Sequence, residues 1–320
     1  MSFAQYVKNE ITLFELSDNE AKAQLAALIM GNASIVISNK NLQLQATFSQ
    51  ALIAKRFVQL VKQIYQVQTN LNTYKRVNLK KDNIYEIVVH EKTKIILEDL
   101  GLWTNNGLQD LLSIRLIASD QGISAYIAGW FLASGSINSP RSSNYHLEFR
   151  VSKSVHKNHL IELLSRYDII AKATERRNQI IVYIKASDQI ADVLRLMMAH
   201  QSLMEYENIR IQRDFHNSLT RLDNCELANE VKSLNAGSKQ VSAINKLKKH
   251  HRLQFLDERL IDIANLRVSN PEASLKELAQ IYENDSGIAM SKSGIKHRLD
   301  KLILIANKIE DPSKINAGFL

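Results

Sequence analysis

Polar and apolar residues follow two different periods along the first two thirds of the chain, one typical of helices and one typical of strands. Helical spacing predicts helices over 20–30, over 51–66 and from Glu91 onward. Period-two alternation predicts strands near 34–38, 42–48, 72–78 and 85–90. A similar order returns further along, with a helix that ends at Leu132, a strand at 145–152, a helix at 155–167, strands near 171–176 and 180–185, and a helix from Asp188 to about His200. The pattern indicates an α+β fold made of two passes through one plan.

The strongest internal repeat lies at the ends of two helices. Residues 25–34 read LAALIMGNAS and residues 127–136 read IAGWFLASGS, in corresponding places of the two halves. Small residues at matching positions, such as Ala27 and Gly129, let two helix backbones approach closely. Two unrelated amphipathic helices are the alternative, which the shared order of the flanking elements disfavours.

Beyond about residue 204 the strand signals stop and the chain is predicted to be helical, with loops near 235–237, 269–271 and 283–290. Ser274 with Glu277 forms a capping-box pattern at the start of a helix predicted to end near Tyr282. A further helix begins at SKSGIKHRLDKL, where Ser291 or Ser293 provides the cap. Its predicted buried stripe consists of Ile295, Leu299, Leu302 and Ile303.

The last of these helices has a basic, polar face, as expected for the second helix of a helix-turn-helix, which enters the major groove of DNA by its N-terminal residues. The candidate DNA-binding residues on it are Ser291, Lys292, Ser293, Lys296, His297, Arg298 and Lys301. A helical packing domain with a solvated basic face is the alternative. The acidic stretch 283–287 predicts a turn longer than that of the simplest motif.

Charge strengthens the case for a polyanionic partner. The net charge is +8 and the pI is near 9.3. No Asp or Glu occurs from Ala21 to Lys81, a stretch that holds nine Lys and Arg residues. A surface without acids avoids repelling phosphates, although chance and acids from neighbouring segments give the same pattern. The single cysteine, Cys225, excludes an internal disulfide and indicates a reducing cytoplasm, and no membrane-spanning window or secretion signal is found.

The two repeated helix ends resemble the paired LAGLIDADG helices of homing endonucleases. The resemblance implies a pseudo-twofold fold in which two αββαββ halves pack through these helices, and two sheets form a saddle over duplex DNA. Candidate saddle residues are Lys75, Arg76, Lys80, Lys81, Arg150, Lys172, Arg176, Arg177 and Lys185.

The residues at the ends of the motif helices argue against nuclease activity. In the enzymes that this fold resembles, an acidic residue there holds a divalent metal, which needs oxygen ligands, preferably anionic. The corresponding residues are the neutral Asn32 and Ser134, so we expect no enzyme activity, no metal and no cofactor. Other candidates are weaker: the histidines lack metal-ligand spacing and are expected on the surface, and a lone cysteine such as Cys225 is more often buried. These histidines are His156, His159, His250 and His251.

A third segment, NSLTRLDNCELANEVK at 217–232, makes the resemblance more specific. Together with the opening SFAQYVKNEI, the degenerate LAGLIDADG pair and the ending SLKEL…SKSGIKHRL, it resembles the WhiA family of bacterial sporulation and cell-division regulators over almost the whole chain. The resemblance implies a degenerate LAGLIDADG-like domain at 1–204, with halves of about 1–105 and 106–204. A linker with the NC..AN segment at 205–235 and an all-α helix-turn-helix domain at 236–320 follow.

The leading hypothesis is a non-catalytic, sequence-specific DNA-binding regulator of transcription that acts in cell division, chromosome segregation or sporulation. Its helix-turn-helix would read sequence and its saddle would add nonspecific affinity. The expected partners are double-stranded DNA and proteins of transcription or cell division, in the cytoplasm at the nucleoid, without a membrane. The alternative is a protein-interaction scaffold that regulates cell division with little dependence on DNA, and an active endonuclease ranks third.

Overall fold

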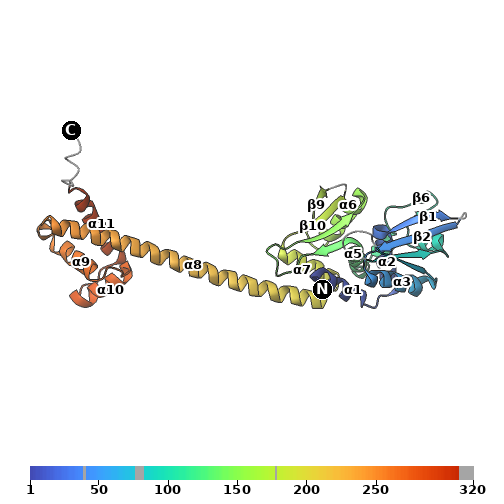
Figure 1. Ribbon diagram of the computed structural model, residues 1–320, viewed down its shortest axis with the longest axis horizontal. Helices are drawn as coiled ribbons and strands as arrows, with labels where there is room; N and C mark the ends of the chain where they lie inside the picture. The colour runs from blue at the N-terminus through green and yellow to red at the C-terminus, as the bar shows by residue number, and fades with distance from the viewer. Residues whose placement is uncertain (39–40, 76–82, 177–178, 310–320) are drawn as a thin grey trace, which may run out of the picture. The chain divides into compact units, whose positions relative to one another are not determined.

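Two separate hydrophobic cores organise the chain in the computed structural model, which describes residues 1–38, 41–75, 83–176 and 179–309. The first core belongs to the unit Met1–Arg213 and the second to the unit Asp214–Leu320 (Figure 1). The division falls within one helix, α8 (His200–Lys249). The domain boundaries expected from the sequence stay predictions.

The first unit contains two halves of the same topology. The first half consists of α2 (Asp18–Asn32), β1 (Ala33–Ser38), β2 (Asn41–Phe48), α3 (Ala51–Tyr65), β3 (Asn70–Lys75), β4 (Asn83–Val89) and α4 (Thr93–Asp99). The second half consists of α5 (Asp120–Ser134), β7 (Gly135–Ile137), β8 (Leu147–Val151), α6 (Ser154–Ser165), β9 (Lys172–Arg176), β10 (Gln179–Ile184) and α7 (Ser187–Leu196). The two antiparallel sheets have the strand orders β1-β2-β4-β3 and β7-β8-β10-β9. The predicted α+β repeat is therefore confirmed.

Some short elements were not predicted from the sequence. The strand β7 completes the second αββαββ half, and its three residues are too few to show alternation. Helix α1 (Phe3–Thr12) precedes the repeat, and a small hairpin of β5 (Trp103–Thr104) and β6 (Gly107–Leu108) lies between the halves together with a 3-10 turn at Ile114–Ile117.

The halves pack through α2 and α5, whose side chains are buried over most of their length. A Cβ atom on Gly129 would lie 2.7 Å from Ala27 Cβ and 2.7 Å from the backbone oxygen of Gln24. Such distances leave no room for a side chain, so the glycine is required for the backbones to approach. The close approach predicted from the small residues is confirmed.

Strand register decides which side chains of each sheet face the helices. In β2, Leu44, Ala46 and Phe48 are buried in the core, and their cross-strand neighbours on β4 include the buried Ile87 and Val89. Residues at the alternating positions lie on the opposite face, because successive side chains of a strand point to opposite sides. We call this second face of each sheet its open face.

The second unit is helical, with the end of α8, α9 (Glu258–Ser269), α10 (Leu275–Ser286) and α11 (Lys292–Asn307) around one core, and a short 3-10 turn at Leu253–Phe255. The loop predicted near 235–237 is wrong, because α8 continues through these residues. A Cβ atom on Gly237 would lie 2.4 Å from Pro271 O. The glycine thus serves a close approach of the 269–271 loop and does not mark a turn.

Candidate nucleic-acid interface

Helix α10 begins and ends at residues whose local chemistry fixes its bounds. The Ser274 N–H donates to Glu277 Oε2 (2.6 Å) and Ser274 Oγ accepts from the Glu277 N–H (3.2 Å), which confirms the predicted capping box. The helix extends to Ser286, beyond the predicted end near Tyr282, and Gly287 follows in a left-handed conformation with φ of 69°. Because the acidic stretch is helical, only Gly287–Met290 separate α10 from the cap of α11. The prediction of a long turn is therefore wrong.

Helix α11 is capped by Ser291, whose Oγ accepts from the Gly294 N–H at 3.1 Å. Ile295, Leu299 and Leu302 are buried in the core of the unit, whereas Ile303 is only partly buried. The core positions hold the helix against α9 and α10 and leave the alternate face toward solvent.

The basic face of α11 is arranged as the sequence predicted. The exposed candidates are Ser291, Lys292, Ser293, Lys296, His297 and Lys301. Arg298 is partly buried, and its Nη1 donates to the Gly294 carbonyl of its own helix at 3.1 Å. A short helix, a tight turn and a second helix with an exposed basic N-terminal face are the parts of a helix-turn-helix. That these residues contact DNA stays a prediction.

The open face of the first sheet carries amides and a carboxylate. Glu86 accepts hydrogen bonds from Asn72 Nδ2 (3.1 Å), Tyr74 OH (2.8 Å) and Gln45 Nε2. The hydrogen bonds, from Asn72 foremost, lower the pKa of Glu86, so the group is charged at neutral pH. A fixed negative charge at this place disfavours a DNA backbone.

The basic candidates of the first half lie elsewhere. Lys75 pairs with Asn83 and shares the face of Thr73 and Tyr85, which is the helix-covered side of the sheet. Arg76, Lys80 and Lys81 lie outside the described residues. Some charges of the acid-free stretch are used internally, since Lys22 pairs with Asp99 at 2.9 Å.

Arg56, another charge of this stretch, is buried, and its Nε donates to Gln24 Oε1 at 2.8 Å.

The open face of the second sheet has more positive charge. Register places Arg150 opposite Ile181 and Lys172 opposite Tyr183, on the face away from the core. Lys185 lies beside them, with its Nζ 5.2 Å from the ring centre of Tyr183. Arg176 lies on β9 opposite Gln179, and Arg177 is outside the described residues.

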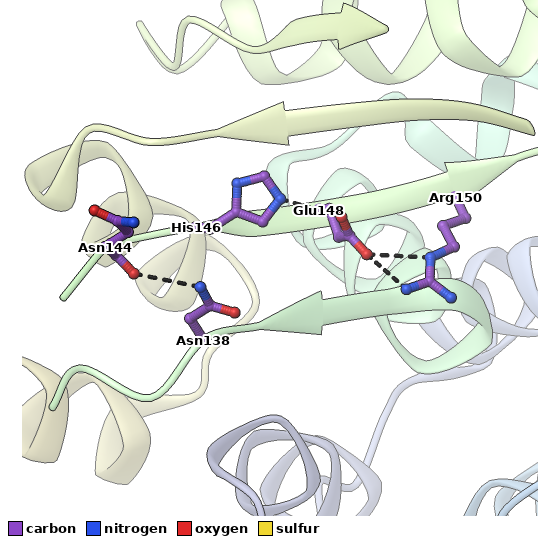
Figure 2. A network of polar contacts seen from close by, with 5 residues as sticks. All are labelled: Asn138, Asn144, His146, Glu148 and Arg150. Carbon is purple, nitrogen blue, oxygen red and sulfur yellow. Dashed lines mark hydrogen bonds and ion pairs between the residues drawn. The ribbon is translucent and has the colours of Figure 1, made fainter. Parts of the chain in front are cut away.

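A carboxylate interrupts this basic face as well (Figure 2). Glu148 Oε1 accepts from Arg150 Nε (3.1 Å) and Nη2 (2.8 Å), and Oε2 lies 3.1 Å from His146 Nε2. Partial burial by itself raises the pKa of Glu148, but the hydrogen bonds and charges of Arg150 and His146 outweigh it and lower the pKa. At the edge of the same view, Asn138 Nδ2 donates to the Asn144 carbonyl at 3.3 Å, which ties the two ends of the loop between β7 and β8.

The ends of α2 and α5 meet at a pocket of about 420 Å³. Asn32 and Ser134 line it, together with Arg150 and Gln179, and no Asp or Glu is among its described lining residues. Asn32 Nδ2 donates to Thr47 O at 3.4 Å, and Ser134 Oγ donates to Trp130 O at 3.4 Å. Across the described parts of the chain, no group of three or more His, Cys, Asp or Glu side chains is arranged to hold a metal ion.

Two expectations about isolated residues are wrong. His156 is buried rather than on the surface: its Nε2 donates to the Asp110 carbonyl at 2.9 Å, and its ring centre is 5.2 Å from that of Trp130. Cys225, expected to be buried, is exposed on α8. Period-based analysis misses both cases, because the burial of a single side chain depends on contacts distant in sequence.

The other histidines differ from each other. His159 is partly buried, with its Nδ1 3.2 Å from Tyr126 OH, and His250 is also partly buried. His251 is exposed. The expectation of surface histidines therefore holds for His251 alone of these four.

The fold and the α10–α11 pair together define a class: proteins with a LAGLIDADG-like unit followed by a helix-turn-helix. Family models agree over most of the chain, with the WhiA N-terminal LAGLIDADG-like domain at residues 18–103, the WhiA LAGLIDADG-like domain at 123–216 and the WhiA C-terminal helix-turn-helix domain at 219–306. The chain belongs to the WhiA family, as the resemblance predicted.

Individual relatives support the same assignment. The chain is 39% identical over 313 residues to the probable cell division protein WhiA of Enterococcus faecalis, covering 98% of this chain and 100% of the relative. It is 38% identical over 315 residues to the protein of the same name from Staphylococcus haemolyticus, covering 98% and 99%. The crystal structure of full-length WhiA from Thermotoga maritima shares the fold, with 22% identity, a TM-score of 0.57 and coverage of 97% of this chain and 100% of that one. None of the helices in the described part of the chain has the length and apolar character needed to cross a bilayer.

Proposed function

We propose that the chain is a sequence-specific DNA-binding regulator in which α11 enters the major groove. The observation that carries the proposal is the exposed basic face at the N-terminal end of α11, placed by the tight turn after Gly287. Lys292 and Lys296 would contact base edges or phosphates from this face, with His297 and Lys301 beside them.

Binding without cutting is the second part of the proposal. The pocket at the ends of α2 and α5 presents an amide, a hydroxyl and a guanidinium, and these groups do not bind divalent metal as carboxylates do. Arg150 adds no metal ligand there, because a guanidinium has donors and no acceptor. The LAGLIDADG-like unit therefore has no catalytic role in this proposal.

Basic residues on the open face of the second sheet would add nonspecific affinity. Lys172 and Lys185 carry this part of the proposal, and Arg176 occupies the same sheet. The first sheet contributes less, because its open face carries Glu86 and because Lys75 lies on the opposite side. The contribution of Arg76, Lys80, Lys81 and Arg177 stays a prediction.

The biological role follows from the relatives, which are named probable cell division proteins. We extend this name to a role for the present chain. We propose that it acts in cell division, chromosome segregation or sporulation, by regulating transcription at the nucleoid in the cytoplasm. We also propose that the domain boundaries lie near residues 204 and 235. The NC..AN segment would then connect the helix-turn-helix domain to the LAGLIDADG-like unit.

A salt series with a fluorescent duplex pool tests the proposal in the full-length protein, with magnesium present and the DNA inspected on a gel. We expect binding that weakens with salt, intact DNA, and a loss of affinity in Lys292→Gln/Lys296→Gln. The matched control is Lys249→Gln, an exposed lysine at the end of α8. Metal-dependent cutting would contradict the non-catalytic assignment.

One observation favours the alternative function, that of a protein-interaction scaffold that regulates cell division with little dependence on DNA. Large apolar side chains are exposed along α8, including Phe215 (66%), Leu222 (60%) and Leu227 (60%), and exposed apolar residues that form a contiguous patch often mark a protein-interaction surface. If the protein is such a scaffold, alanine at Lys292 and Lys296 leaves its function in cells intact. The regulator predicts that this substitution abolishes it.

A further inference from the structure

A pocket of about 500 Å³ in the C-terminal unit lies between α8 and the N-terminal ends of α10 and α11. Lys232 of α8, Lys276 in the first turn of α10 and Lys292 at the start of α11 line it, and all three are exposed. The described lining residues include no Asp or Glu. The N-terminal ends of α10 and α11 add partial positive charge to that of the three lysines, and together these charges favour an anion in the pocket.

A buried cation provides an independent indication of an anionic ligand. Arg267 also lines the pocket and is only 2% exposed. Its Nη1 donates to the carbonyls of Asn270 (3.2 Å), Pro271 (3.3 Å) and Ala273 (2.7 Å), which fixes the loop before α10. Its Nε has no hydrogen-bond partner in the described structure.

No carboxylate of the described residues forms an ion pair with this guanidinium. Burial lowers the pKa of Arg267 from its ordinary value, yet a guanidinium stays charged at neutral pH. A buried charge without a counter-ion is costly, and an anion in the pocket would offset part of that cost.

We propose that this pocket binds a phosphate group and that the DNA backbone supplies it. The inference rests on the proposed function and adds α8 to the DNA-binding surface as a third element. A phosphate at the N-terminal ends of α10 and α11 would hold the register of the recognition helix while its side chains read base edges. Asn229 lines the same pocket, which gives the NC..AN segment a role in shaping the phosphate site.

Salt-dependent DNA binding of the full-length protein tests the inference. Lys232→Gln and Lys276→Gln should each reduce the slope of log affinity against log salt, and the double variant should reduce it by about 0.9, the value for one lost phosphate contact. Affinity should fall by a similar factor, roughly three- to tenfold, on unrelated duplexes, because a phosphate contact carries no base information. Lys249→Gln, outside the pocket, should bind as the unchanged protein does, and thermal unfolding checks that each variant is folded.

The outcomes separate this inference from the proposed function. If the unchanged protein binds DNA and both pocket variants bind with the same affinity and slope, the inference is wrong and the regulator proposal stands. If the unchanged protein does not bind DNA, inorganic phosphate becomes the probe. Stabilisation by phosphate over chloride at equal ionic strength, lost in Lys232→Gln, supports a phosphate site filled from a free source, and no stabilisation overturns the site.

Discussion

Arg150 donates two hydrogen bonds to a single oxygen of Glu148, from Nε at 3.1 Å and from Nη2 at 2.8 Å, on the open face of the second sheet (Figure 2). The ion pair compensates the positive charge of the Arg150 guanidinium. A DNA-binding saddle would need that charge unpaired, so that it could contact phosphate. The charge of Arg150 on this face is therefore offset by a carboxylate. In the proposed function, most of the DNA-binding energy comes from the C-terminal unit.

Removing that carboxylate should strengthen nonspecific DNA binding. Glu148→Gln deletes a negative charge from the open face and frees the Arg150 guanidinium for phosphate. We expect higher affinity for unrelated duplexes and a steeper salt dependence, measured by fluorescence anisotropy over a salt series. Glu162→Gln, which breaks an exposed ion pair with Arg166 on α6, is the matched control and should change neither quantity. Equal behaviour of the two variants would show that the second sheet does not meet DNA.

Stability should rise with pH between about 8 and the ordinary lysine value, because of Lys8. This lysine is nearly buried, and its Nζ donates to the Leu132 carbonyl at 3.2 Å. Burial foremost, with the charge of Arg150, lowers the pKa of Lys8 to about 8 from 10.5. Below pH 8 both states hold the proton and the full cost of burying the charge is present, whereas above it only the unfolded state keeps the proton. Lys8→Met should flatten this part of the curve of unfolding free energy against pH, and parallel curves would contradict the assignment.

Gly129→Ala should destabilise the first unit by about 1 to 3 kcal/mol, the usual cost of overpacking a core. The added methyl group would collide with Ala27 and with the backbone of Gln24, so α2 and α5 must move apart. Chemical denaturation measures the effect. Ser134→Ala, near the end of the same helix, removes only a hydrogen bond to Trp130 of that helix and should change stability far less. A variant at Gly129 as stable as that control would mean that the helices are not in close contact.

Gly287→Ala should destabilise the C-terminal unit by about 1 kcal/mol, because an L-residue with a Cβ is strained in the left-handed region. Space is not the obstacle, since a Cβ atom there would meet nothing within 4 Å. Gly287→Asn is the discriminating control, because asparagine tolerates this conformation better. Thermal unfolding and DNA affinity should both follow the order Gly, Asn, Ala, and an unaffected alanine variant would argue against the tight turn.

Local sequence was enough to predict the elements whose signals span a few residues. The capping box of Ser274 with Glu277 is a contact between neighbours three residues apart, and it forms as predicted. The alternation of Leu44, Ala46 and Phe48 likewise fixes the buried face of β2. The repeated small residues at Ala27 and Gly129 indicated helix pairing because only small side chains allow backbones so close.

Tertiary structure decided the features that depend on distant contacts. All residues of β3 are exposed, so its own alternation does not reveal which face Lys75 occupies, and only pairing with β4 does. Gly237 lies inside a helix rather than a turn because the loop at Pro271 packs onto it. The pocket around Arg267 brings together residues of α8, α9, α10 and α11, from Asn229 to Lys292. Sequence by itself determined the longer elements of the repeat, the family and the basic face of α11, because these depend on residue type and short-range spacing. The charges on each sheet face and the anion pocket were decided by the fold, because register and packing join residues that no local period relates.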